Sequence, residues 1–348
     1  MPRTPDVMML MPSLKRCLET AFVLLVASAA GGTVSQPRPA STLPLKLVAD
    51  IALPGPTNRF DYQSYDSTSH RLFIAHLGAS KVIAFDTRAN KLAGEIANIS
   101  QVHGVLVVPA TGKIYASATG TNEIAVIDAQ TLKEVARGAA GVYPDGIAYA
   151  PDVHKLYVSD ETGRTETVID TETNRRVATI ALDGEVGNTQ YDAASRRIFV
   201  NVQTLNRLVE IDPQTDEVIG RYALPGARHN HGLLIDSTLR VAYVACEGNA
   251  KLLVFDLDSK QVLASEAVGD DPDVLALDEA LHWLYVASES GVVSIFEQDG
   301  KRLKKIGEAM LAKRAHSVAV DPETHRVYFP LENVNGRAVL RIMEPVRQ

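Results

Sequence analysis

Seven positions recur in the sequence at an almost constant spacing, and six of them hold a side chain that can bind a metal or transfer a proton. In chain order they are Asp61, His103, Asp145, Gly187, His231, Asp273 and His316, with glycine as the one exception. Successive members lie 42, 42, 42, 44, 42 and 43 residues apart. Imidazole and carboxylate groups bind Zn, Cu, Fe, Ni or Mn, and a histidine beside a carboxylate also works as an acid–base pair. We therefore predict that His103, His231 and His316 bind a divalent metal ion of undetermined identity.

Further charged side chains occur shortly before or after these positions. The predicted ligand-binding residues, other than the histidines, are Asp61, Asp145, Asp273, Arg59, Arg228, Arg314, Glu247 and Glu289. An arginine can bind a carboxylate or a phosphate through two parallel hydrogen bonds. A structural interpretation stays open beside this one, because an Asp or His at the start of a strand can cap the preceding loop.

The seven positions open copies of one repeat, which is clearest between Asp145 and Glu185. Four short β-branched and aromatic runs there are separated by clusters of Asp, Gly, Asn and Thr, as in strands joined by hairpins. Twelve positions after each opening stands an aromatic residue: Phe73, Tyr115, Tyr157, Phe199, Tyr243, Tyr285 or Tyr328. A period of this length, with four antiparallel strands per repeat, predicts an all-β fold, a seven-bladed β-propeller over residues 45–346.

The last copy lacks a fourth strand, and the start of the repeat region supplies a matching segment. Residues 45–55 (LKLVADIALPG) resemble the fourth strand at residues 217–226 (EVIGRYALPG). We expect this N-terminal strand to complete the last blade and to close the ring, which leaves no radial edge unpaired.

In a propeller the first strand of each blade lines the central channel, so the seven positions should form a ring near one mouth of that channel. The loops after the second strands, which carry Glu247 and Glu289, should reach the same mouth. Gly187 lacks a side chain, and we expect it to leave a notch through which a ligand approaches the ring.

The first 30 residues are typical of a secretory signal peptide. Lys15 and Arg16 precede the short apolar run of residues 21–30, and Ala27-Ser28-Ala29 fits a cleavage site. Residues 31–44, rich in Gly, Ser, Thr and Pro, are expected to be a flexible lead-in. The mature protein is thus predicted to be a periplasmic or extracellular monomer, and no stretch long enough to span a membrane remains after cleavage.

Charge and cysteine content restrict the function further. The formal net charge is −7 and no basic run occurs, which disfavours nucleic-acid binding. Cys246 is the one cysteine left after signal cleavage, so no internal disulfide can form. We interpret it as a small buried side chain, with a soft metal ligand or reactive thiol as the alternative.

The second-strand motifs resemble those of the YVTN-repeat, or YncE-like, family of seven-bladed propellers. They read LYVSD (156–160), IFVNV (198–202), AYVAC (242–246) and LYVAS (284–288). The segments GIAYAPD (146–152) and SVAVDPETHRVY (317–328) are similar to the family's first strand and turn. The resemblance implies an extracytoplasmic propeller and leaves the function open, because members of this family have diverse roles.

Two functions agree with these observations. The first is a binding propeller that takes a small polar ligand, a metal or a partner protein at the channel mouth. The alternative is a metal-dependent lyase or hydrolase similar in architecture to streptogramin lyases and lactonases, where the metal polarises a substrate oxygen or activates water. No H-E-x-x-H, C-x-x-C-H, G-x-S-x-G or Walker motif decides between them.

Overall fold

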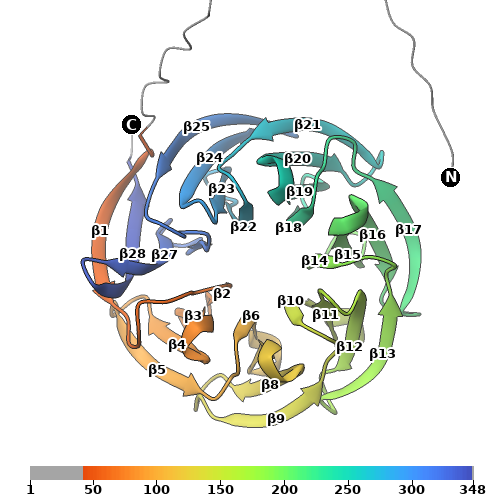
Figure 1. Ribbon diagram of the computed structural model, residues 1–348, viewed down its shortest axis with the longest axis horizontal. Helices are drawn as coiled ribbons and strands as arrows, with labels where there is room; N and C mark the ends of the chain where they lie inside the picture. Colours follow the sequence, from red (N-terminus) through yellow and green to blue (C-terminus); the bar gives the residue numbers. More distant parts are fainter. Residues whose placement is uncertain (1–41, 347–348) are drawn as a thin grey trace, which may run out of the picture. The chain divides into compact units, whose positions relative to one another are not determined.

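The computed structural model describes residues 42–346, which belong to one compact unit. The expected signal peptide (1–30) and residues 31–41 of the expected lead-in lie outside the described residues. Seven four-stranded antiparallel sheets surround a central axis (Figure 1). This arrangement confirms the predicted seven-bladed β-propeller. Within residues 42–346 no helix is long and apolar enough to cross a membrane.

Six blades are built from strands that are consecutive in the chain. Blade one contains β2 (Gln63–Asp66), β3 (Arg71–His76), β4 (Lys81–Asp86) and β5 (Lys91–Ala97). Blade two contains β6 (Val102–Val108), β7 (Lys113–Ala118), β8 (Glu123–Asp128) and β9 (Glu134–Ala139). Blade three contains β10 (Pro144–Ala150), β11 (Lys155–Asp160), β12 (Thr165–Asp170) and β13 (Arg175–Ala181). Blade four contains β14 (Val186–Asp192), β15 (Arg197–Val202), β16 (Arg207–Asp212) and β17 (Glu217–Ala223).

Blade five contains β18 (Asn230–Asp236), β19 (Val241–Cys246), β20 (Lys251–Asp256) and β21 (Gln261–Ala267). Blade six contains β22 (Pro272–Asp278), β23 (Trp283–Ser288), β24 (Val292–Asp299) and β25 (Arg302–Met310). Short 3₁₀ turns link strands within the blades: η1 (Leu77–Ala79), η2 (Pro109–Thr111), η3 (Thr119–Thr121), η4 (Pro151–Val153), η5 (Gln203–Leu205) and η6 (Glu247–Asn249). In every blade the first strand faces the central channel and the fourth lies at the periphery (Figure 1).

Blade seven joins the two ends of the described chain. Its sheet order is β1 (Leu45–Ala52), β28 (Arg337–Pro345), β27 (Val327–Val334) and β26 (Ala319–Val320). β1 runs antiparallel to β28, with Leu47 opposite Met343 and Ile51 opposite Leu340. The predicted closure of the ring by the N-terminal strand is therefore confirmed.

The acidic residues that end the third strands fix the turns that follow. Carboxylate oxygens of Asp86, Asp128, Asp170 and Asp212 each accept the backbone N–H two residues later, at 2.9–3.2 Å. Such Asx turns reverse the chain into the outer strand. β24 differs because its strand continues past Glu297 to Asp299.

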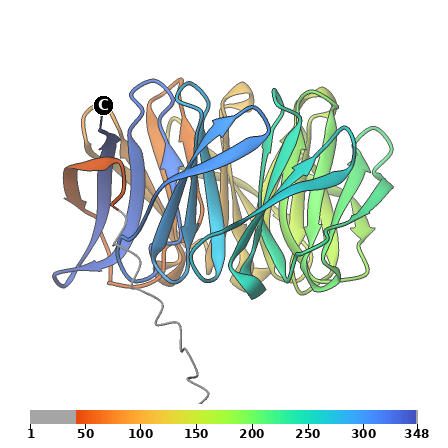
Figure 2. The ribbon, with the colours of Figure 1, turned by 90° about the horizontal axis from the view of Figure 1, so that it is seen from above.

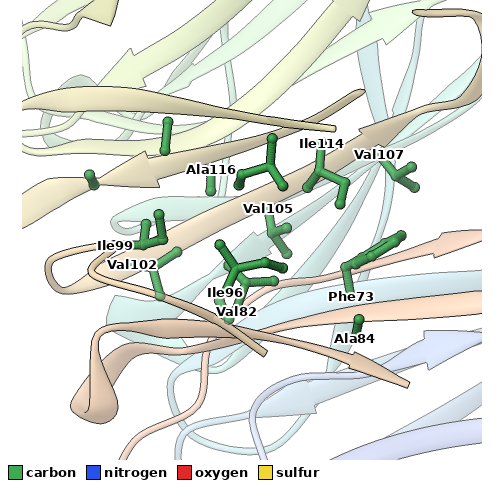
Figure 3. Packing of buried hydrophobic residues seen from close by; sticks show 14 residues of the cluster. Phe73, Val82, Ala84, Ile96, Ile99, Val102, Val105, Val107, Ile114 and Ala116 are labelled. Atoms are coloured by element: carbon green, nitrogen blue, oxygen red, sulfur yellow. The ribbon is translucent and has the colours of Figure 1, made fainter. Parts of the chain in front are cut away.

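Apolar side chains of neighbouring blades interlock to form the core. Figure 3 shows one such layer, in which Phe73 and Ile96 of blade one pack with Val105 and Ile114 of blade two. The seven aromatic residues that recur twelve positions after each opening are all fully buried: Phe73, Tyr115, Tyr157, Phe199, Tyr243, Tyr285 and Tyr328. The blades stand side by side with their strands running through the thickness of the ring (Figure 2).

Candidate functional site

A backbone irregularity at the start of the inner strands positions the seven repeated residues. The pairing register between first and second strands shifts between Val102 and Val105, and at equivalent points in four other blades: Pro144/Ile147, Val186/Thr189, Asn230/Leu233 and Pro272/Leu275. In blades one and seven the strand begins only after this point, so Asp61 and His316 precede β2 and β26. Bulges of this kind re-aim a side chain, and here they lie next to the channel mouth.

The mouth of the channel contains a cavity of about 250 Å³. Its lining residues are Arg59, Asp61, Tyr62, His103, Tyr143, Asp145, Glu161, His231, Glu247, Asp273 and Glu289. The structure thus brings eight of the eleven residues predicted from the sequence around one cavity. The lining holds six carboxylates but a single arginine, which makes the cavity strongly acidic.

The three predicted arginines do not converge. Arg59 lies in the cavity wall, with Nε 3.2 Å from Asp61 and Nη1 2.6 Å from Glu289. Arg314 is half exposed, its Nη1 3.7 Å from Glu332, and neither Arg314 nor Arg228 lines the cavity. Burial alone would lower the pKa of Arg59, but the carboxylates of Asp61 and Glu289 outweigh this effect and hold the value above the ordinary one.

All three predicted histidines are held by the same ring nitrogen. The Nδ1 atoms of His103 and His316 lie 2.9 and 3.0 Å from the carbonyl oxygen two residues earlier in the chain. Nδ1 of His231 lies 2.9 Å from the side-chain oxygen of Gln203. Because the oxygen at Nδ1 accepts a hydrogen bond from the ring N–H, the neutral form of each ring has its lone pair on Nε2, as in histidines that bind metals.

The Nε2 atoms have different surroundings. In His103 the Nε2 atom lies 3.1 Å from the hydroxyl of Tyr143. In His231 it lies 3.3 Å from the hydroxyl of Tyr62, and 3.5 and 3.8 Å from carboxylate oxygens of Asp145 and Asp273. Nε2 of the buried His316 has no hydrogen-bond partner among the described residues.

Two groups of side chains have the composition and spacing of a metal site. One is His231, Glu247 and Asp273, and the other is Asp273, Glu289 and His316. Within each group one ligand atom per residue lies within 4.8 Å of the others. The structure therefore divides the predicted set of three histidines: His231 and His316 belong to adjoining groups that share Asp273, and His103 belongs to neither.

Burial and charge strongly perturb the protonation of this cluster. Burial raises the pKa of Asp145 to about 7 and that of Asp273 to about 6, although nearby histidines oppose the rise. Burial alone would lower the pKa of His231, but Glu247, Asp273 and Asp145 outweigh it and raise the value to about 9. In the absence of a bound cation, His231 is thus an imidazolium among carboxylates at neutral pH.

Tyr62 forms the floor of the site and was not predicted from the sequence. It extends from blade one across the channel, with its hydroxyl 3.3 Å from Nε2 of His231 in blade five. It lines both the mouth cavity and a deeper channel cavity of about 140 Å³. A signal was present, because the residue after each repeated position is not aromatic in any of the other six blades: Gly104, Gly146, Asn188, Gly232, Val274 and Ser317.

The expectation that Gly187 leaves a notch in the ring is wrong. A Cβ atom at this position would lie 2.8 Å from Cα and 2.7 Å from the carbonyl oxygen of His231. The neighbouring inner strand occupies the space, so the glycine permits close approach of β14 and β18 rather than entry of a ligand.

Cys246 is fully buried in the core of blade five. Burial raises the pKa of its thiol to about 12, which keeps it protonated and unreactive. Its position agrees with the interpretation as a small buried side chain.

Comparison with known proteins identifies the fold and no family. No protein-family model and no curated protein matches the sequence. A Kuenenia stuttgartiensis hydrazine synthase structure is similar, with a TM-score of 0.70 and 17% identity over 84% of this chain and 97% of that chain. A structure of U3-55K has a TM-score of 0.71 and 11% identity, over 84% and 98% of the two chains. The WD40 repeats of RRP9 give a TM-score of 0.72 and 12% identity over 87% and 100%. At these identities the likeness concerns architecture alone, and the chain is a seven-bladed β-propeller.

Proposed function

We propose that this protein is an exported, YncE-like monomeric propeller that binds a divalent metal ion at the mouth of its channel. One observation carries the proposal: His231 and His316 each lie with two carboxylates in a group of ligand atoms within 4.8 Å of one another. Borderline divalent cations such as Zn²⁺ and Mn²⁺ accept this mixture of imidazole and carboxylate ligands.

The electrostatics of the mouth support a cation rather than an anion as the ligand. Six carboxylates line the cavity against one guanidinium, that of Arg59. Three of them, Asp61, Asp145 and Asp273, are buried, and desolvation penalises the charged forms of Asp145 and Asp273. A bound metal ion would stabilise these charges directly, since bound cations are often the largest charges in a site.

Replacing the three predicted histidines by alanine tests the proposal. We expect His103→Ala/His231→Ala/His316→Ala to weaken metal binding by more than about 100-fold, since even outer partners of metal ligands are worth about 10- to 100-fold. Calorimetric titration with Zn²⁺, Mn²⁺, Ni²⁺, Cu²⁺ and Ca²⁺ measures the effect on untagged protein recovered from the periplasm. The intact mass of that protein also reports whether residues 1–30 have been removed. Affinity should fall with falling pH, because a metal must displace the proton of His231.

The control variant is His154→Ala/His282→Ala, which removes two histidines from turns outside the mouth. It should bind metal as the wild type does. Equal binding by the triple variant and the wild type would return the three histidines to a capping role. A wild type that binds none of the five cations would refute the proposal itself.

A metal-dependent lyase or hydrolase is the second candidate, and the position of Tyr62 favours it. Each metal group supplies three protein ligands, which leaves coordination positions for water or substrate as in catalytic zinc sites. The hydroxyl of Tyr62 lies 3.3 Å from Nε2 of His231 and 3.5 Å from Oδ1 of Asp273, where it could transfer a proton.

If this second function holds, Tyr62→Phe should lower turnover by about 100-fold or more while metal affinity changes little, because proton transfer alone is lost. A screen of lactones and esters with metal-loaded protein provides the rate. Tyr149→Phe, at the other end of an inner strand, is the matched control. Absence of turnover in the wild type would leave the binding function alone.

A further inference from the structure

Asp273 belongs to both candidate metal groups, and this double membership is the feature from which we argue. We propose that the mouth binds two divalent cations side by side, bridged by the carboxylate of Asp273. The first would lie among His231, Glu247 and Asp273, and the second among Asp273, Glu289 and His316. This inference rests on the proposed function and specifies its stoichiometry.

The separation between Asp273 and His231 fits metal coordination, and the two glutamates would exchange their present partners for a metal ion. A carboxylate oxygen of Asp273 lies 3.8 Å from Nε2 of His231, the ring nitrogen that is available to a metal. Glu247 lies 3.9 Å from the other ring nitrogen, Nδ1, and its second oxygen is 3.0 Å from Nδ1 of His229. In the second group a Glu289 oxygen lies 3.6 Å from Nδ1 of His316, the nitrogen that faces the Arg314 carbonyl, and its other oxygen is 2.6 Å from Nη1 of Arg59. Ligands about 2.1 Å from a tetrahedral zinc stand about 3.4 Å apart. Hydrogen-bonded pairs would be closer, at about 2.7–3.2 Å.

The charge of the cavity also favours more than one cation. With the histidines neutral, six carboxylates and one guanidinium leave five negative charges in the lining. One divalent cation would leave three of them, whereas two would leave one. Several uncompensated charges in a partly buried cavity repel one another strongly, so the second cation relieves a cost that the first cannot.

A further buried carboxylate atom lacks any partner in the protein. Asp145 is 2% exposed and lines the mouth cavity, yet its Oδ1 atom has no hydrogen-bond partner among the described residues. Its other oxygen lies 3.5 Å from Nε2 of His231, on the side of the first group. Buried polar atoms in proteins are nearly always satisfied, so this carboxylate oxygen is available to a cation or to a water molecule.

Two adjacent cations bridged by a carboxylate typically lie about 3.5–4 Å apart. The donor set of one imidazole and two carboxylates for each ion matches Zn²⁺ or Mn²⁺ and disfavours soft ions. These two ions are therefore the probes for the experiment.

Metal content per chain measures the proposal directly. Untagged protein is dialysed against Zn²⁺, and bound metal is determined by elemental analysis, with two ions per chain expected. Glu247→Gln and Glu289→Gln remove one terminal ligand from the first and second group, and each should retain one tightly bound ion. Asp273→Asn removes the bridge and should weaken both sites. The control is Asp270→Asn, which changes an exposed residue just before β22 and should retain two ions.

A second measurement tests adjacency. Wild-type protein loaded with Mn²⁺ should give the electron paramagnetic resonance spectrum of an exchange-coupled pair, and Glu247→Gln should give that of an isolated ion. One ion per chain in the wild type, or two without coupling, would overturn the dinuclear site and leave the proposed function intact. No bound metal would overturn both. If Asp273→Asn fails to fold, the two glutamine variants and the spectrum still decide the question.

Discussion

Removal of β1 is expected to lower the melting temperature of the propeller strongly or to abolish its cooperative thermal unfolding. β1 supplies the outermost strand of blade seven, where Leu45 packs with the core and Asp50 binds Arg341 through two contacts of 2.8 and 2.6 Å. The innermost strand of that blade, β26, is only two residues long. Without β1 the blade would keep two substantial strands, and an isolated pair of strands is marginal in water.

The consequence would extend beyond blade seven. The polar backbone groups of β28 that pair with β1 would become an open edge, and the apolar faces of blades six and one would lose their neighbour. A chain of residues 53–348 should therefore melt at least about 10 °C below a chain of residues 42–348, or show no sharp transition. Circular dichroism melting compares the two. Equal melting temperatures would show that the ring is stable without the closing strand.

The fold could be predicted because the repeat encodes it locally. Alternating apolar residues, the buried aromatic of each second strand and the Asp that ends the third strand in five blades all recur within single hairpins. The segment Leu45–Ala52 was placed in blade seven for the same reason, since it repeats the sequence pattern of other outermost strands.

The site was predictable only in part, because its decisive contacts cross the ring. Tyr62 meets His231 and Asp273 across 169 and 211 residues of chain, and no local pattern reports such distances. The pairing of His231 with Gln203 also joins two blades. Repeat position correctly placed the carboxylates at one mouth, but it could not show that Asp273 would be shared between two groups or that the neighbouring strand would fill the space at Gly187.

One buried side chain breaks the apolar pattern of the repeat and carries the second stability prediction. Glu166 is the second residue of β12 and is fully buried. The equivalent position holds an aliphatic residue in five other blades: Val82, Ile124, Leu208, Leu252 and Val293. Two residues later on the same face of the strand, Val168 packs against blade four, so Glu166 lies in the interface between blades.

No well-formed hydrogen bond reaches this carboxyl group in the described part of the chain, although the Thr189 hydroxyl lies near enough to stabilise its charged form. Both oxygens of Glu166 are buried without a hydrogen-bond partner. Burial raises its pKa well above the ordinary value and the charge of Asp160 adds to the rise, while the Thr189 hydroxyl opposes it. The folded protein therefore holds Glu166 protonated under conditions in which the unfolded chain has released the proton.

The sign of the pH effect follows from this difference. Below the unfolded-state pKa of about 4.5 the carboxyl group of Glu166 is neutral in both states, so folding takes up no proton there. As the pH rises above that value, folding must take up a proton, so the free energy of unfolding falls by up to about 1.4 kcal/mol per pH unit until the raised pKa of the folded state is reached. Glu166→Leu removes this dependence and restores the side chain found in blades four and five. It should be about 1–3 kcal/mol more stable than the wild type at pH 7, the range for a buried polar group without a partner.

Urea unfolding of wild type and Glu166→Leu between pH 4 and pH 8 measures the prediction. The difference in free energy of unfolding should be smallest near pH 4 and should grow with pH, because only the wild type must take up the additional proton. Glu217→Leu, at an exposed strand position, is the control and should leave the pH profile of the wild type unchanged. A wild type more stable than Glu166→Leu at pH 7 would mean that the carboxyl group has a compensating partner. A difference independent of pH would mean that the group keeps an ordinary pKa in the folded protein.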